Sequence, residues 1–138
     1  AVLSAGWGNL KGVDLPDTVM QVGYVPHGWL FKQVSAVAHH GGAGTTGAGI
    51  RAGVPSIIIP FGGDQPYWGE RVYKLGIGPK PILRSKLNDD NFASAIYQAT
   101  HDQRMIEQSK VIGSVLRAEN GVEHAIQIIE QKTAANVK

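Results

Sequence analysis

Short apolar runs of strand type alternate with longer mixed stretches of helical type along the whole chain. Glycine and proline separate these stretches, as they do between secondary-structure elements. Strands are predicted at residues 1–5, 19–25, 34–38 and 56–61, with a weaker one at 80–83. Helices are predicted at residues 27–31, 44–52, 66–75, 88–100, 103–116 and 121–132. This alternation predicts an α/β fold, a Rossmann-like parallel sheet with helices on both faces.

The chain is predicted to form one compact domain over residues 1–132, followed by a short polar tail at 133–138. Its 138 residues are enough to build a hydrophobic core. Gly53-Val54-Pro55 ends one predicted helix, and Asn88 or Asp89 is the predicted N-cap of a later one. No internal repeat, low-complexity tract or linker divides the sequence.

Composition excludes several classes of function without selecting one. The formal net charge of +2 is too small to indicate nucleic-acid binding, and no block of like charge is present. The absence of cysteine excludes disulfides and thiolate chemistry and fits a reducing compartment. The longest apolar run is far shorter than the roughly 20 residues of a membrane span, and no signal-peptide pattern is present. A cytoplasmic location is the resulting expectation.

Residues 38–47, AHHGGAGTTG, are the most informative stretch of the chain. An apolar strand leads into two histidines, then into a glycine-rich turn, and then into a helix that begins with hydroxyl residues. Glycines let the backbone approach a ligand closely, and the N-terminus of a helix favours an anion, most often phosphate. The apolar strand at residues 55–60 completes a β-α-β unit. The pattern therefore predicts a ligand that carries phosphate.

Two kinds of phosphate ligand fit this turn. Gly42, Gly44 and Gly47 satisfy the dinucleotide fingerprint, and Asp64 lies about 20 residues on, where that fingerprint expects an acidic residue. Against a nicotinamide or flavin, two histidines crowd the turn, Asp64 follows a Phe-Gly-Gly loop, and two strands precede the motif. Nucleotide-sugar binding is favoured over dinucleotide binding and over a purely structural glycine turn.

Four motifs in order carry a family resemblance: the pattern PHxWLF…HHGGxGTTGAxxRAGxP…PFxGDQ. It resembles the C-terminal, donor-binding half of GT-B enzymes of the UDP-glycosyltransferase superfamily. It is most similar to UDP-glucose:sterol glucosyltransferases and related bacterial enzymes. The resemblance runs from about residue 4 to residue 99. It implies a UDP-sugar donor, expected to be UDP-glucose, with no cofactor and no metal, and inverting transfer to a hydroxyl of a sterol or other lipophilic acceptor.

The resemblance assigns the donor's diphosphate to the glycine turn. His40 would hydrogen-bond the diphosphate and stabilise the negative charge of the leaving UDP, while Ala43, Gly44 and Thr45 would offer backbone N–H groups and a hydroxyl. The alternative for His40 is a strand-end histidine bonded to the backbone, and for Thr45 an ordinary helix cap. Strand alternation turns His39 to the other face, so packing or a backbone bond is expected there.

The resemblance places the base and the sugar on two other loops. Val25, through its backbone, and His27 match positions that meet uracil, although a histidine after proline is often a helix cap. Asp64 and Gln65 match the pair that binds the hydroxyls of the transferred sugar, since a carboxylate accepts and an amide also donates. The alternative for Asp64 is an Asx-type turn before Pro66.

Several neighbouring positions complete this interpretation. Tyr67 and Trp68 are candidates for the mouth of the acceptor site, with a buried helix stripe as the alternative. Ala48 stands where plant relatives carry the glutamate that holds ribose, which leaves UDP and TDP both open. His101 and His124, on polar late helices, are poor candidates for a catalytic base.

Other parts of the family pattern are not found in this sequence. The resemblance implies that the first strand–helix unit of this C-terminal half, which would supply a central strand of the sheet, is missing. The strands on either side of it are expected either to pair directly or to seek a partner. The N-terminal half, which supplies the general base and most of the acceptor pocket, is also absent. The parent is therefore expected to be a hexosyltransferase, and this chain alone inactive, with no catalytic residue beyond the supporting His40. Peripheral membrane association of the parent, self-association of the chain and a non-catalytic scaffold role stay open.

Overall fold

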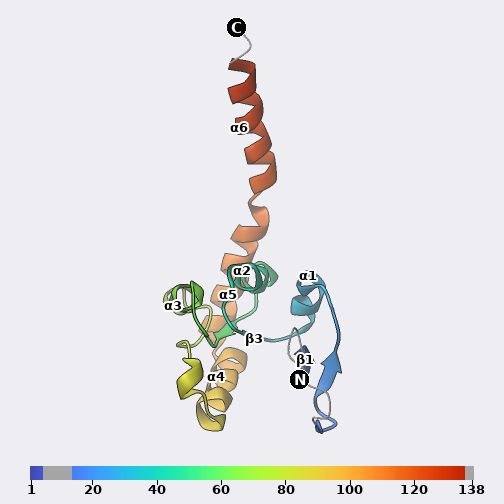
Figure 1. The fold of residues 1–138 in the computed structure, drawn as a ribbon, viewed down its shortest axis with the longest axis vertical. Helices are drawn as coiled ribbons and strands as arrows, with labels where there is room; N and C mark the ends of the chain where they lie inside the picture. The colour runs from blue at the N-terminus through green and yellow to red at the C-terminus, as the bar shows by residue number, and fades with distance from the viewer. Residues whose placement is uncertain (5–13, 136–138) are drawn as a thin grey trace.

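A computed structural model describes residues 1–4 and 14–135 of the chain (Figure 1). Strands and helices alternate in its first half, and helices alone make up its second half. In chain order the elements are β1 (Val2–Ser4), β2 (Met20–Val22), α1 (His27–Leu30), the 3₁₀ helix η1 (Phe31–Gln33), β3 (Val37–His39), α2 (Ala43–Ala52), β4 (Ser56–Ile58), α3 (Gln65–Lys74), the 3₁₀ helix η2 (Arg84–Lys86), α4 (Asp89–His101), α5 (Gln103–Ala118) and α6 (Gly121–Ala135).

The strands form two parallel pairs, β1 with β2 and β3 with β4. Val2 is in register with Met20, and Val37 with Ser56. Within the described residues no hydrogen-bonded pairing joins β1 to β3, so the two strands on either side of the expected central strand do not pair directly. In Figure 1 the first pair lies beside the rest of the fold, at some distance from β3. The break falls where the resemblance expects the missing central strand, which would be the element that joins the two pairs.

The predicted strand at residues 80–83 is absent as a strand. Its segment still follows β4, because the N–H of Ile82 donates to the carbonyl of Ile58 at 3.0 Å. Pro79 and Pro81 flank this contact and have no N–H to donate, so the segment cannot extend a regular ladder. The chain then turns into η2 instead of continuing along the sheet.

The core lies on both faces of β4, all three residues of which are buried. Ile57 packs with Ala95 and Ala99 of α4, whereas Ile58 packs with Val72 of α3 and with Ile77. Neighbouring residues of a strand point to opposite faces, so one strand serves two clusters. The prediction that helices cover both faces is confirmed for the β3–β4 pair.

Helix α2 lies close to this pair because it carries glycine where the two meet. A Cβ atom built on Gly49 would lie 2.7 Å from Ser56 Oγ and 3.3 Å from Val37 Cγ2. The helix ends at Gly53, which has the left-handed φ of 78° that favours glycine. Helix α5 crosses behind it, where a Cβ on Gly113 would lie 2.7 Å from Gly53 Cα.

The later helices begin and end at polar caps. Asn88 is the N-cap of α4 and forms a capping box with Asn91, which confirms one of the two predicted cap positions. Helix α6 projects away from the rest of the fold (Figure 1). It continues to Ala135, so residues 133–135 are helical where a tail was predicted. Residues 136–138 of that tail, and residues 5–8 of the family resemblance, lie outside the described residues.

Candidate functional site

The centre of the candidate site is the turn between β3 and α2. His40 follows directly after β3, and its side chain is exposed. A Cβ built on Gly42 would lie 2.6 Å from His40 Nε2, so the imidazole lies against the glycine that precedes the helix. The sequence therefore places an imidazole beside the N-terminus of a ten-residue helix, where its N–H and the helix N–H groups can meet one anion.

The first turn of α2 is open toward this imidazole. Gly42 is the N-cap and has no side chain to bond the helix, and neither threonine takes that role. The first bond of the helix is donated by Thr46 N to Gly42 O at 2.9 Å. The N–H groups of Ala43, Gly44 and Thr45 precede that bond and have no partner in the described part of the chain. Ala43 and Gly44 are exposed, which leaves these donors accessible to a ligand.

His39 takes part in the turn in a different way. Its Nδ1 accepts a hydrogen bond from the N–H of Gly41 at 3.1 Å, which confirms the expected backbone bond. Burial lowers the pKa of His39 from 6.5 to about 4, with smaller contributions from the nearby His40 and His27. The ring is therefore neutral at ordinary pH. Gly41 itself has a φ of 91°, which a residue with a side chain would adopt only with strain.

His27 and Val25 come from the loop after β2. His27 opens α1, where its ring stacks on Phe31 with ring centroids 4.6 Å apart. The N-cap of α1 is Pro26 and no side chain caps it, so His27 is not the cap. Helix α1 contacts α2, and the charge of His27 reaches His39, so this loop lies at the same end of the fold as the glycine turn. Val25, in the same loop, is half-buried.

The Asp64–Gln65 pair lies beside the same turn. A Cβ built on Gly41 would lie 3.2 Å from the carbonyl oxygen of Gln65 and 3.6 Å from Gln65 Cβ. Both loops follow the carboxyl ends of the parallel strands β3 and β4, the edge at which ligands bind in α/β sheets. The structure thus brings together residues that are 24 positions apart in the sequence, 41 and 65.

Both side chains of this pair already bond their own loop. Gln65 Oε1 accepts from the N–H groups of Phe61 at 2.7 Å and Gly62 at 3.2 Å. Asp64 Oδ2 accepts from the indole N–H of Trp68 at 2.8 Å. The amide NH₂ of Gln65 and the second carboxylate oxygen of Asp64 remain, one a pair of donors and the other an acceptor. Among the described hydrogen bonds, Asp64 accepts from a side chain and from no backbone N–H, so the Asx-type turn is not formed. The remaining groups of the pair can meet vicinal hydroxyls.

Comparison with known proteins decides the family. Residues 6–131 match the model of the "Erythromycin biosynthesis protein CIII-like, C-terminal domain" family. The chain belongs to this family. The EryCIII-like domain is 48% identical to a sterol 3-beta-glucosyltransferase of Aspergillus oryzae and 49% identical to one of Emericella nidulans. Each alignment covers 93% of the chain but only 10% of the relative.

Solved structures agree on the fold. The EryCIII-like domain superposes on the kitacinnamycin glycotransferase with a TM-score of 0.80 at 28% identity, over 89% of this chain and 32% of that one. It superposes on the glycosyltransferase VinC, solved in complex with dTDP, with a TM-score of 0.72 at 27% identity, over 86% of this chain and 31% of that one. The predicted resemblance to the C-terminal half of GT-B glycosyltransferases, and the α/β fold class, are confirmed.

Sequence reasoning missed two contacts of the EryCIII-like domain that shape the loop after β4. Trp68 was a candidate for the acceptor mouth, but its indole N–H holds Asp64, one helical turn away. The i, i+4 spacing of these residues is the signal that could have found this bond. The guanidinium of Arg84 lies over the Phe61 ring, 5.1 Å from its centroid. Nothing in the sequence pattern links these two positions, which meet only through the path of residues 79–83.

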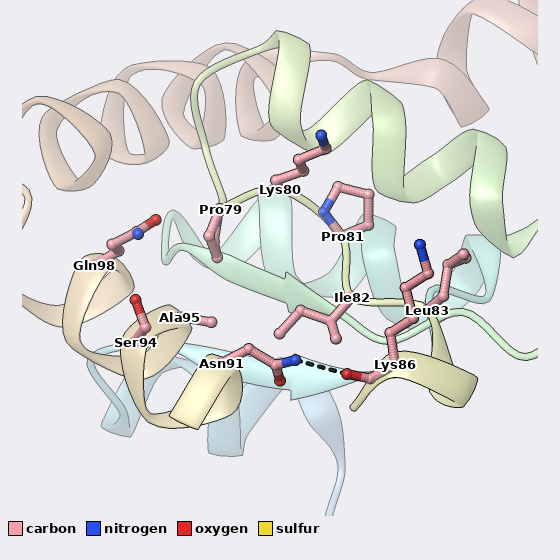
Figure 2. Close-up of a pocket in the computed structure, with 10 residues that line it drawn as sticks. All are labelled: Pro79, Lys80, Pro81, Ile82, Leu83, Lys86, Asn91, Ser94, Ala95 and Gln98. Atoms are coloured by element: carbon pink, nitrogen blue, oxygen red, sulfur yellow. Dashed lines mark hydrogen bonds between the residues drawn. The ribbon is translucent and has the colours of Figure 1, made fainter. Parts of the chain in front are cut away.

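Two cavities of the EryCIII-like domain lie away from the glycine turn. Figure 2 shows an open groove of about 450 Å³ between the segment 79–83 and α4, crossed by a hydrogen bond from Asn91 Nδ2 to the Lys86 carbonyl at 2.7 Å. It contains none of the predicted site residues. A second hollow of about 530 Å³ is lined by Pro60, Phe61, Leu83, Arg84 and Ser85. This second hollow adjoins the loop that carries Asp64.

Two features are absent from residues 1–4 and 14–135. No three side chains of histidine, cysteine, aspartate or glutamate gather there in a way that could hold a metal ion. Within the same residues, no helix has both the length and the apolar character that crossing a membrane requires.

Proposed function

We propose that this chain binds the nucleotide-sugar donor of an inverting glycosyltransferase, with UDP-glucose as the donor. The parent enzyme would transfer glucose to a hydroxyl of a sterol or another lipophilic acceptor. The observation that carries the proposal is the exposed His40 imidazole beside the open N-terminus of α2, with Gln65 against the same turn. The names of the fungal relatives support a sterol acceptor. The chain spans about a tenth of their length.

The diphosphate would lie at the start of α2. Negative charge grows on the diphosphate as the bond to the sugar breaks, and preorganised donors stabilise it. His40 would donate from its imidazole, and Ala43, Gly44 and Thr45 from their backbone N–H groups, with the Thr45 hydroxyl close by. These groups need no rearrangement, because the helix holds the N–H donors and Gly42 leaves room for the ring.

The sugar and the base would lie on either side of the diphosphate. The free oxygen of Asp64 would accept from one glucose hydroxyl, and the Gln65 amide would donate to its neighbour. Val25, through its backbone, and His27 would meet the uracil at the α1 side of the turn. Ala48 offers no polar group to the ribose, so the choice between UDP and dTDP rests on the base.

The catalytic base is proposed to lie outside this chain. The two histidines away from the site do not serve: His101 stacks on Tyr97 at the end of α4, and His124 is exposed on α6. The chain would supply no catalytic residue beyond the diphosphate-stabilising His40, no metal and no cofactor. The parent is proposed to be cytoplasmic, with peripheral membrane contact through its lipophilic acceptor, and without nucleic-acid partners.

Calorimetric titration of the chain with UDP-glucose, UDP, dTDP and NAD tests this function. UDP and UDP-glucose should bind, NAD should not, and His40→Ala should weaken UDP by about 10- to 100-fold, the loss of one hydrogen bond to a charged group. His124→Ala, an equal substitution on exposed α6, should leave UDP binding unchanged. Binding of NAD alone would favour a dinucleotide-binding domain. Tighter binding of dTDP than of UDP would show that the donor base is thymine and not uracil.

A further inference from the structure

One half-buried histidine beside the site, His39, has no place among the proposed donor contacts. His39 ends β3 on the same face as Val37, the face that packs against α2 at Gly49. Its Nδ1 accepts from the N–H of Gly41, and an accepting nitrogen carries no proton, so the proton of the neutral ring is on Nε2. Nε2 is buried and has no partner in the described part of the chain.

The bond to His39 acts on the residues that carry the donor contacts. It spans two residues, from 39 to 41, and has the connectivity of an Asx turn, with imidazole nitrogen in place of a carboxylate or amide oxygen. The turn that it closes contains His40 and leads directly to Gly42, the N-cap of α2. Fixing the Gly41 amide therefore fixes the direction in which His40 leaves the strand.

The surroundings of Gly41 leave this turn little other support. The residue has a φ of 91°, and its Cα faces Ile58 Cγ2 and the Gln65 carbonyl, which a Cβ would approach to 2.6 Å and 3.2 Å. These contacts limit movement toward β4 but supply no acceptor for the Gly41 N–H. Only the ring of His39 accepts from this amide among the described residues.

We propose that His39 is a positioning residue: by accepting the Gly41 amide it holds the His40–Gly42 turn in the form that binds the donor diphosphate. The expected effect of His39 on donor affinity rests on the proposed donor function. Its role in holding the turn does not. An acceptor is required at this position, and a side chain of similar size without an acceptor leaves the Gly41 N–H buried and unpaired, which is costly.

Titration gives the inference a second consequence. The titratable groups that act on His39 are His40, next to it in the chain, and His27 of α1. Burial keeps the pKa of His39 near 4, so Nδ1 remains an acceptor at ordinary pH. In acid, a protonated Nδ1 becomes a donor and faces the Gly41 N–H, also a donor. The turn then loses its closing bond, and donor affinity falls with it.

The test uses His39→Asn, whose amide oxygen can accept from the residue two positions on, and His39→Leu, which cannot accept. His124→Leu on exposed α6 is the matched control. Hydrogen exchange of the Gly41 amide reports on the turn without ligand, and calorimetry with UDP reports on the site. We expect His39→Asn to keep the protection of Gly41 and UDP affinity within about threefold, and His39→Leu to lose protection and about tenfold in affinity.

Each result of this test either supports or overturns the proposal that His39 positions the turn. Protection of Gly41 that survives His39→Leu, or UDP binding unchanged when that protection is lost, overturns the inference. If the unsubstituted chain binds no UDP, the proposed function fails and the link to the donor with it, while hydrogen exchange still shows separately whether His39 holds the turn. If His39→Leu does not fold, the pH profile decides: the UDP affinity of the unsubstituted chain should fall relative to that of His39→Asn as the pH drops through about 4, the folded-state pKa of His39. Parallel profiles would overturn the inference.

Discussion

Gly42→Ala should disable the donor site without disturbing the fold. Gly42 has a φ of −61° and a ψ of 143°, which alanine adopts without strain. The new Cβ would lie 2.6 Å from His40 Nε2, and the next nearest atoms are also in the His40 ring, at 3.4 and 3.5 Å. An ordinary contact needs about 3.5 Å, so the ring must withdraw by about 1 Å. The ring is exposed and can do this by rotating away from α2.

The size of the effect follows from what His40 is proposed to do. A hydrogen bond to a charged group contributes about 1.5–3 kcal/mol, and losing it weakens UDP binding by about 10- to 100-fold. Stability should change by no more than about 1 kcal/mol, because alanine is a poorer N-cap than glycine but also restricts the unfolded chain. Calorimetry with UDP and thermal melting followed by circular dichroism measure the two quantities on the same samples.

The neighbouring glycine is the matched comparison. Gly41→Ala would force a side chain into a φ of 91° and bring its Cβ to 2.6 Å from Ile58 Cγ2 and 3.2 Å from the Gln65 carbonyl. Left-handed strain and overpacking together should cost about 2–4 kcal/mol, visible as a lower melting temperature. Unchanged UDP affinity in Gly42→Ala would refute the proposed role of His40. A loss of stability in Gly42→Ala equal to that of Gly41→Ala would refute the steric reasoning.

Three further predictions address the sugar loop, a helix cap and pH. Trp68→Phe removes the indole N–H that holds Asp64. In calorimetry UDP-glucose should then bind about three- to tenfold more weakly, while UDP binds as before. An equal loss of affinity for both ligands would contradict a role of Asp64 in binding the sugar. Asn88→Ala removes the capping box of α4 and should lower the free energy of unfolding by about 1 kcal/mol in denaturant titrations. The affinity for UDP should not change. A change in UDP affinity would mean that α4 reaches the site. The folded chain keeps His39 neutral down to about pH 4, whereas the unfolded chain protonates it near pH 6.5, because the pKa of His39 is lowered from 6.5 to about 4. Between these two pH values the unfolded state therefore binds more protons than the folded state, and the stability of the fold decreases as the pH falls. Melting temperatures measured across that range should decline less in His39→Asn, and identical slopes would show that His39 is not the group responsible.

Local features of the sequence predicted the elements around the site well. The strand–turn–helix unit at residues 34–52 was predicted from an apolar run, a glycine cluster and the breaker at Gly53, and all three lie close together in the chain. The cap at Asn88 was predicted for the same reason. Such signals act over a few residues through backbone sterics and short hydrogen bonds, so the sequence states them directly.

One predicted strand is absent from the structure, and the pairing of two others could not be read from the sequence. The apolar run at residues 80–83 predicts a strand. Pro79 and Pro81 have no N–H to donate, so the segment cannot form a regular ladder and makes one hydrogen bond, from Ile82 N–H to the Ile58 carbonyl. The sequence left open whether β1 and β3 pair directly, and in the described residues no hydrogen bond of a ladder joins them.

The sequence by itself determined that a glycine turn and a helix N-terminus follow an apolar strand, and that histidines, Asp64 and Gln65 stand at fixed places around them. Tertiary structure alone decided which of these groups are free. It placed Gln65 against Gly41 and left His40 exposed beside the start of α2. The bonds of Asp64 to Trp68 and of His39 to Gly41, by contrast, join residues only four and two positions apart. The physical reason is that a residue's type sets which bonds it can make, whereas packing of strands and helices far apart in the chain sets which partners it meets.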